Sequence, residues 1–331
     1  METFRSPRAG PQPPALGRRG KKLTGHGDDV AFTMEFLRPK ATSLKLIRVG
    51  GRIDGGYLLP DDLGGVRHCF SPGVENRKDF EDEILTKHNI YSHMADFSSS
   101  VQDLRTPLVK GKQTFDKKWI ATETASDSIS MADWIASKDL ETREELLLQM
   151  DIEGGEYEIL SKLSNSLLRR FRVIVLELHD LHLVRSETVL SSRIMPMVRK
   201  LSESFVTVHA HPNNCCEVVD LPEFGVTVPR ILELTLIRKD RFVPPNARRS
   251  ARVLLPHPKD VLWNVPIRRP RHLGLDWVGG QRPFISKLRI VFDYSRYYLF
   301  GRWRRRIPMT LLVLGRNLRR RGRRPSGPIR K

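Results

Sequence analysis

The chain has 331 residues, of which 39% are hydrophobic and 29% are charged. This composition supports a folded core and excludes a chain that is disordered throughout. The net charge of +19 is concentrated at the ends, because residues 1–22 carry +5 and residues 302–331 carry +12, which leaves +2 for residues 23–301. A nearly neutral body argues against a nucleic acid that lies across the whole domain.

The three cysteines, Cys69, Cys215 and Cys216, match neither a disulfide framework nor a paired zinc site, so we expect reduced thiols. Residues 1–28 contain no apolar run of the signal-peptide type. The apolar stretch at 307–315 is too short to span a bilayer. These features predict a cytoplasmic protein.

Composition divides the chain into four parts. Residues 1–28 are rich in Gly, Pro and Arg, which predicts a disordered basic segment. Residues 29–242 carry the periodic apolar pattern of a folded domain. Residues 243–300 are Pro-rich and are expected to form an extension and a helix that pack on this domain. Residues 301–331 are an Arg-rich tail, expected to be disordered or bound to a surface.

Apolar strands alternate with amphipathic helices along the predicted domain. Helices are predicted at 30–37, 80–88, 131–137 and 187–203, with one more after residue 155. Strands are predicted at 44–49, 66–70, 90–96, 119–121, 146–150, 173–178, 205–210 and 231–238. The link over 211–230 has no long apolar helix, so the last two strands are expected to be antiparallel. The fold class is therefore α/β, with a mostly parallel, Rossmann-like sheet and helices on both faces.

Polar residues and glycine stand at the carboxyl ends of the predicted strands, where α/β sheets bind ligands. Gly73 would let a ligand approach the backbone closely, and Asp96 can accept hydrogen bonds from a ribose. Asp151, Glu177 and His179 follow the next two strands. Each residue alone has a structural explanation, such as a helix cap or a buried histidine. Their succession at neighbouring strand ends favours a ligand of the nucleoside type.

The run 148–160, which reads LQMDIEGGEYEIL, resembles the Asp-x-Glu-Gly-x-Glu signature of FkbM-type methyltransferases. Further segments resemble elements of one branch of that family in the same order: 52–57, 71–81, 211–214 and 229–239. The resemblance covers roughly residues 44–270. It implies a class I methyltransferase fold with a seven-stranded sheet and an antiparallel last strand pair. It also implies S-adenosylmethionine as the methyl donor.

The resemblance implies roles for single residues as well. The cofactor is expected to contact Ser71, Gly73, Asp96, Asp127, Ser128 and Asp151. The methyl acceptor is expected to contact Asp54, Tyr57, Glu153, Asn213 and Asn214. A hydroxyl acceptor needs a base within hydrogen-bond reach, and the candidates for that catalytic role are Asp151, His179 and His211.

A metal site is a weaker alternative, with Glu177 and His179 as candidate ligands. These two side chains point the same way on a strand. Acids and histidines clustered at a strand end are more often the polar wall of an active site, so no metal is predicted.

The leading prediction is an enzyme that methylates a hydroxyl group of a sugar, a glycan or another small molecule. One alternative is an RNA methyltransferase held by the basic ends. The nearly neutral body and the absence of an Asn-Pro-Pro-Tyr motif argue against that nucleic-acid interpretation. Another alternative is a non-catalytic binding protein of a membrane or glycan-assembly complex. Aromatic and Arg residues within 285–306 also predict peripheral contact with an anionic membrane.

Overall fold

The computed structural model describes residues 25–51, 55–213, 216, 218–245, 253, 255 and 257–260. The predictions for the first 24 residues and for the Arg-rich tail lie outside these ranges. Within them, no helix has the length and apolar character needed to cross a membrane. The first helix, α1 (Gly25–Leu37), begins earlier than the expected residue 30.

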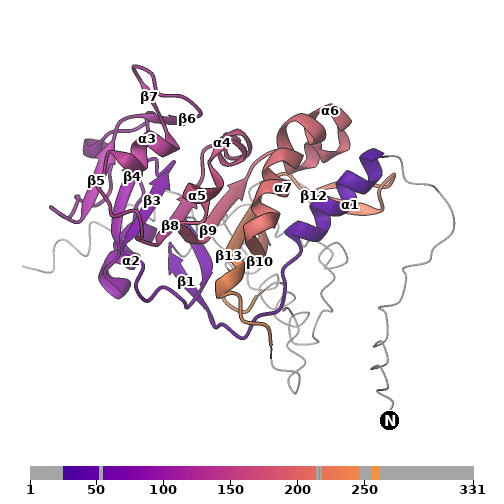
Figure 1. Ribbon diagram of the computed structural model, residues 1–331, viewed down its shortest axis with the longest axis horizontal. Coiled ribbons are helices and arrows are strands. Elements are labelled where there is room, and N and C mark those ends of the chain that lie inside the picture. Colours follow the sequence, from indigo (N-terminus) through magenta and orange to yellow (C-terminus); the bar gives the residue numbers. More distant parts are fainter. Residues whose placement is uncertain are drawn as a thin grey trace, which may run out of the picture.

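A seven-stranded sheet forms the centre of the molecule (Figure 1). Its strand order is β10-β13-β9-β8-β3-β4-β5. The strands are β3 (His68–Pro72), β4 (Tyr91–Ala95), β5 (Gln113–Asp116), β8 (Leu146–Met150), β9 (Phe171–Leu178), β10 (Phe205–Pro212) and β13 (Leu232–Arg238). The five strands from β9 to β5 pair in parallel, whereas β13 is antiparallel to both of its neighbours. This is the class I methyltransferase fold with the antiparallel last strand pair that the sequence predicts.

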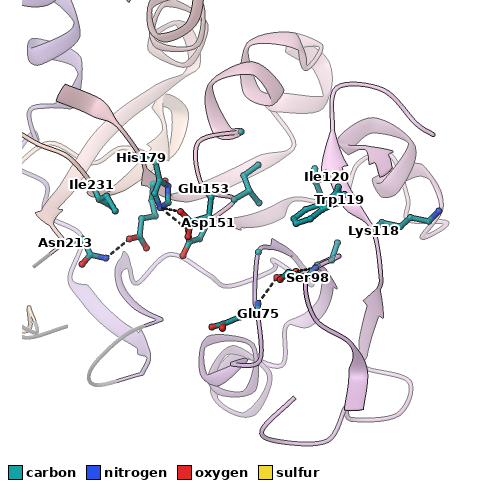
Figure 2. A pocket seen from close by; sticks show the side chains of 16 residues that line it. Glu75, Ser98, Lys118, Trp119, Ile120, Asp151, Glu153, His179, Asn213 and Ile231 are labelled. Atoms are coloured by element: carbon teal, nitrogen blue, oxygen red, sulfur yellow. Dashed lines mark hydrogen bonds and ion pairs between the residues drawn. The ribbon is translucent and has the colours of Figure 1, made fainter. Parts of the chain in front are cut away.

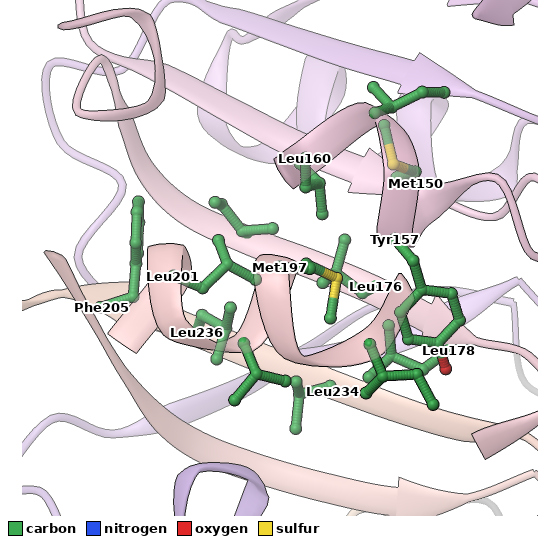
Figure 3. Close-up of a cluster of buried hydrophobic side chains, with 14 of the residues drawn as sticks. Met150, Tyr157, Leu160, Leu176, Leu178, Met197, Leu201, Phe205, Leu234 and Leu236 are labelled. Atoms are coloured by element: carbon green, nitrogen blue, oxygen red, sulfur yellow. The ribbon is translucent and has the colours of Figure 1, made fainter. Parts of the chain in front are cut away.

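One face of the sheet is covered by helices. These are α1, α3 (Met131–Ala136), α4 (Glu156–Lys162), α5 (Asn165–Leu168) and α7 (Met195–Ser204). Alternate residues of each strand point to this face, so Leu146 and Leu148 of β8 lie in this cluster. Figure 3 shows apolar side chains of α4 and α7 against those of β9 and β13. Burial of each such side chain stabilises the fold by about 1.5–3 kcal/mol.

The other face is covered by α2 (Asp79–His88) and by a hairpin of β1 (Leu46–Gly50) and β2 (Gly56–Pro60). Phe80 and Ile84 of α2 pack with Tyr57 of the hairpin against Leu147 and Val173 of the sheet. Because both faces are covered, every residue of β8 and β9 is buried.

The structure corrects the prediction that residues 119–121 form the strand of the main sheet next to the one predicted at 90–96. That place belongs to β5, whereas β6 (Trp119–Ala121) pairs with β7 (Ser128–Ser130) in a separate two-stranded parallel sheet. The β5 sequence, QTFD, contains one apolar residue. This composition is compatible with its place at the edge of the sheet, because an edge strand has one neighbour and tolerates polar side chains. Apolar patterning therefore could not identify it.

The long helix predicted at 187–203 is interrupted. It consists of α6 (Glu187–Val189), a π-helical turn η3 (Leu190–Ile194) and α7. The link before β13 forms a second hairpin, β11 (Val218–Leu221) and β12 (Val226–Pro229). Short 3-10 turns complete the described elements: η1 (Val101–Asp103), η2 (Leu181–Arg185) and η4 (Lys239–Arg241).

Candidate active site

A cavity of about 500 Å³ lies beyond the carboxyl ends of four parallel strands (Figure 2). The residue that directly follows each strand lines it: Gly73 after β3, Asp96 after β4, Asp151 after β8 and His179 after β9. The volume lies within the range of pockets that hold small molecules and cofactors. The remaining lining residues are Glu75, Ala95, Ser98, Lys118, Trp119, Ile120, Ile152, Glu153, Gly155, Glu177, Asn213 and Ile231.

Two loops meet at the middle of the cavity, one after β3 and one after β8. Gly73 adopts a φ of +84°, and its amide donates to the carbonyl of Ala95 at 2.9 Å. The amide of Asp151 donates to the carbonyl of Pro72 at 3.2 Å. A Cβ atom on Gly73 would lie 1.6 Å from the Asp151 carbonyl oxygen. Glycine is thus required here by the contact between the loops as well as by its φ angle.

The loop after β8 is held from two sides. Glu153 and Gly154 have φ angles of 55° and 105°. The Glu156 carboxylate accepts a hydrogen bond from the amide of Ile152 at 2.9 Å. From the π-helical turn, Arg193 donates to the carbonyl of Gly154 at 2.6 Å. These contacts fix the Asp151 side chain at the cavity wall.

One end of the cavity has the character of a nucleoside site. Asp96 is only 7% exposed, and its carboxylate accepts from the amide of Glu75 at 2.8 Å and from the amide and hydroxyl of Ser98 at 2.8 and 2.6 Å. Trp119 is 50% exposed and lies beside Ile120 at this end (Figure 2). An acid next to an open aromatic and aliphatic surface suits a ribose joined to a base.

Three residues predicted to contact the cofactor do not line this cavity. Asp127 and Ser128 lie at the β6–β7 pair, where the carbonyl of Asp127 accepts from the amide of Trp119 at 2.9 Å. The strand that faces them, β6, therefore supplies the lining side chains, which are Trp119 and Ile120. Ser71 is fully buried beneath the cavity, where it hydrogen-bonds to Glu81 and, at 2.5 Å, to Gln149.

The opposite end of the cavity is acidic around His179. The His179 Nε2 atom lies 3.2 Å from a Glu153 oxygen and 3.7 Å from Asp151 Oδ1, and its Nδ1 atom lies 3.3 Å from Glu156 Oε1. Burial lowers the pKa of His179, but the hydrogen bond to Glu156 and the charges of Glu156, Glu177 and Glu153 outweigh it and raise the pKa to about 9. His179 is therefore an imidazolium at neutral pH in the protein without ligands.

Asp151 shares this end with Glu177. Burial raises the pKa of Asp151 well above its usual range, and the adjacent Glu177 carboxyl raises it further. Glu177 is held in place by Asn213, whose side-chain amide donates to its Oε1 atom. The Tyr57 hydroxyl donates to the Oε2 atom of Glu177 at 3.5 Å. Asn213 lines the cavity as predicted, whereas Tyr57 is buried behind Glu177.

The structure removes His211 from the list of candidate bases. Its Nδ1 atom lies 3.5 Å from Asp260 Oδ2, and the Nε2 atom of His209 lies 3.0 Å from Asp260 Oδ1. Burial raises the pKa of Asp260, but the two histidines outweigh it and hold the pKa at about 2. His211 therefore belongs to a buried cluster outside the cavity. The predicted acceptor residues Asp54 and Asn214 lie outside the described residues.

The sequence does not single out two lining residues, Trp119 and Ile120, which it assigns only to a strand. It also does not single out Glu156, which is buried against His179 and appears only as part of the motif. An aromatic residue three positions after the end of the polar edge strand is the one signal that could identify Trp119. The final Glu of Asp-x-Glu-Gly-x-Glu could have identified Glu156, because a fully buried carboxylate in a first helical turn needs a partner.

The buried carboxyl of Glu81 predicts a pH-dependent stability. Complete burial raises its pKa to about 7, although the hydrogen bond with Ser71 opposes this. Unfolded chains ionise this group near pH 4.5, so the folded state binds the extra proton between these values, and the free energy of unfolding falls as pH rises from 4.5 to 7.

We expect Glu81→Gln to remove this loss. The wild type should lose about 3 kcal/mol of unfolding free energy between pH 4.5 and pH 8 that the variant does not lose. The difference between the two proteins should therefore grow by that amount over this range. Urea unfolding of both proteins at the two pH values measures the difference. A difference between variant and wild type that does not change with pH would show that Glu81 is already ionised in the folded protein.

One segment of the chain matches a known protein family. Residues 73–204 match the family described as Methyltransferase FkbM domain. The matched segment begins at Gly73, the glycine after β3. It contains Asp96, Asp151 and His179, which follow β4, β8 and β9. None of the curated protein sequences matches the chain.

Two solved structures with similarity to this chain are methyltransferases. The precorrin-6y C5,15-methyltransferase from Geobacter metallireducens GS-15 is 14% identical, with a TM-score of 0.30 over 67% of this chain and 94% of that chain. A mutant form of the 16S rRNA (adenine(1408)-N(1))-methyltransferase from Catenulisporales acidiphilia is 12% identical, with a TM-score of 0.26 over 62% of this chain and 100% of that chain. The resemblance predicted from the sequence motifs is thus confirmed by the family match: residues 73–204 are a methyltransferase FkbM domain.

Proposed function

We propose that this protein transfers a methyl group from S-adenosylmethionine to a hydroxyl group of a sugar, a glycan or another small molecule. The observation that carries the proposal is the division of one cavity into a nucleoside-like end and an acidic end. Trp119 lies at one end, and Asp151 with His179 lies at the other (Figure 2). Asp96 lines the same cavity and is hydrogen-bonded to Ser98.

The residues present fit S-adenosylmethionine. Its ribose would meet Asp96, and its adenine would meet the apolar surface of Trp119 and Ile120. Carboxylates at the other end favour a positively charged ligand group. Within the described part of the chain, Asp151 and Glu153 form ion pairs with His179 and with no Lys or Arg. When bound, the cofactor supplies a methyl group on a sulfonium, which is already activated for transfer.

The protein then has two tasks. The first is to place the acceptor oxygen in line, for which Asn213 and Glu177 offer a fixed donor and acceptor pair. The second is to assist the loss of the acceptor proton, because a sugar hydroxyl is a weak acid. Asp151 is the candidate base at this end, and His179, whose pKa is raised to about 9, can accept a proton only after it has lost its own. The raised pKa of Asp151 makes its carboxylate a stronger base than an ordinary one.

Product chemistry tests this proposal. The protein would be incubated with methyl-tritiated S-adenosylmethionine and, separately, with nucleotide sugars, simple glycosides and total RNA. We expect label in a carbohydrate product that survives mild alkali, because a methyl ether is stable there and a methyl ester is not. Label that appears only in RNA, or only in an alkali-labile product, would contradict O-methylation of a hydroxyl group.

A further inference from the structure

The acidic end of the cavity has the geometry of a cation site. Asp151, Glu156 and His179 each offer one ligand atom, and these atoms all lie within 4.8 Å of one another. An ion bound at about 2.0–2.6 Å from each ligand atom requires those atoms to lie at most about 5 Å apart. One ion can therefore contact all three side chains after small side-chain adjustments.

Two buried carboxylate oxygens at this place lack a hydrogen-bond partner within the described residues. One is Oδ1 of Asp151, and the other is Oε2 of Glu156. The side chain of Glu156 has no exposed surface, and its other oxygen faces the His179 ring at 3.3 Å. A buried, unsatisfied carboxylate oxygen costs about 1–3 kcal/mol or more, so a native structure that keeps two of them together points to an ion between them.

The local charge points the same way. Within the described ranges, His179 is the sole ion-pair partner of Asp151, Glu153 and Glu156. Buried carboxylates are normally paired or bound to a metal, and a cation at this place would face both Asp151 and Glu156.

We propose that Asp151, Glu156 and His179 bind a divalent metal ion at the acceptor end of the cavity. The two carboxylates suit Mg²⁺ or Mn²⁺, and Mn²⁺ also accepts the imidazole, whereas a thiolate-preferring metal finds no cysteine among the cavity residues described. Three protein ligands leave positions for water or for an acceptor oxygen.

The role of the ion rests on the proposed function, whereas its binding does not. A hydroxyl group bound to the ion becomes more acidic, so its proton can pass to water at neutral pH. In that case Asp151 and His179 act as metal ligands and assist proton loss through the ion. Without an ion, the Asp151 carboxylate would have to accept the proton directly.

Electron paramagnetic resonance with Mn²⁺ alone tests the site without any turnover. Chelator-treated protein is titrated into MnCl₂, and the six-line signal of free Mn²⁺ is recorded. We expect one Mn²⁺ to bind per chain, with displacement by excess Mg²⁺. Glu156→Gln and Asp151→Asn should each weaken binding at least about tenfold. Glu158→Gln is the matched control, because Glu158 is an exposed carboxylate of the same helix, and it should bind as the wild type does.

Circular dichroism of each variant separates a lost site from a lost fold. Asp151→Asn is the second variant because the Asp151 side chain is 28% exposed, so its replacement should disturb the fold less than replacement of the fully buried Glu156. A wild-type protein that leaves the Mn²⁺ signal unchanged would overturn the proposal, and so would folded variants that bind as the wild type does. Calorimetry with S-adenosylmethionine on the same samples tells the two proposals apart. Cofactor binding without Mn²⁺ binding would refute the metal site alone.

Discussion

Replacing Gly73 with alanine is expected to reduce the free energy of unfolding by about 3–5 kcal/mol. Two effects combine at this position. Gly73 has a φ of +84°, where a side chain strains the backbone, and its Cβ would lie 1.6 Å from the Asp151 carbonyl oxygen. That oxygen belongs to the backbone of the neighbouring loop, so the clash can be relieved only by moving the β3 and β8 loops apart.

Two other glycines serve as controls for the separate effects. Gly111 has a φ of +75° with no atom near its Cβ position, so Gly111→Ala measures the backbone strain alone. Gly64 has neither feature, and Gly64→Ala should change stability by less than about 1 kcal/mol. Urea unfolding of the three variants gives the comparison. A Gly73→Ala protein that is no less stable than Gly111→Ala would show that the loops do not meet as described.

Replacing Asp151 with asparagine is expected to lower the rate of methyl transfer about 10³-fold. The change keeps the size of the side chain but removes its charge and basicity. Affinity for S-adenosylmethionine should change by less than about tenfold, because in the proposed arrangement Asp96 and Trp119 hold the other end of the cofactor. Single-turnover rates with tritiated cofactor and calorimetric titration measure the two quantities.

Glu158→Gln provides the control in the same rate assay, because it removes a carboxylate from the exposed side of α4. Its rate should match that of the wild type. An Asp151→Asn protein with an unchanged rate would contradict the role of Asp151. A rate that falls together with cofactor affinity would instead assign Asp151 to binding of the cofactor.

The sequence predicted the strand-end residues because their signal is local. Each follows an apolar run, and the carboxyl ends of parallel strands meet at one edge of a sheet. This predicts that Gly73, Asp96, Asp151 and His179 lie close together, and the structure places all four around one cavity. The same reasoning gave the antiparallel last strand pair, since a link without a long helix favours a reversal of direction.

The errors came from contacts between segments that are distant in the sequence. His211 and His209 both contact Asp260, which lies about fifty residues later and carries no motif. Glu156 has the ordinary appearance of an acid in a first helical turn, and only the fold brings His179 against it. The polar strand β5 was missed because an edge position does not require an apolar pattern.

Calorimetric titration of the wild-type protein with S-adenosylmethionine measures directly whether this cavity binds the proposed cofactor. We expect one site per chain with a dissociation constant on the order of micromolar. Asp96→Asn should weaken that binding at least about tenfold, because the amide replaces one acceptor oxygen with a donor. No heat of binding from wild-type protein that is shown to be folded would contradict the account.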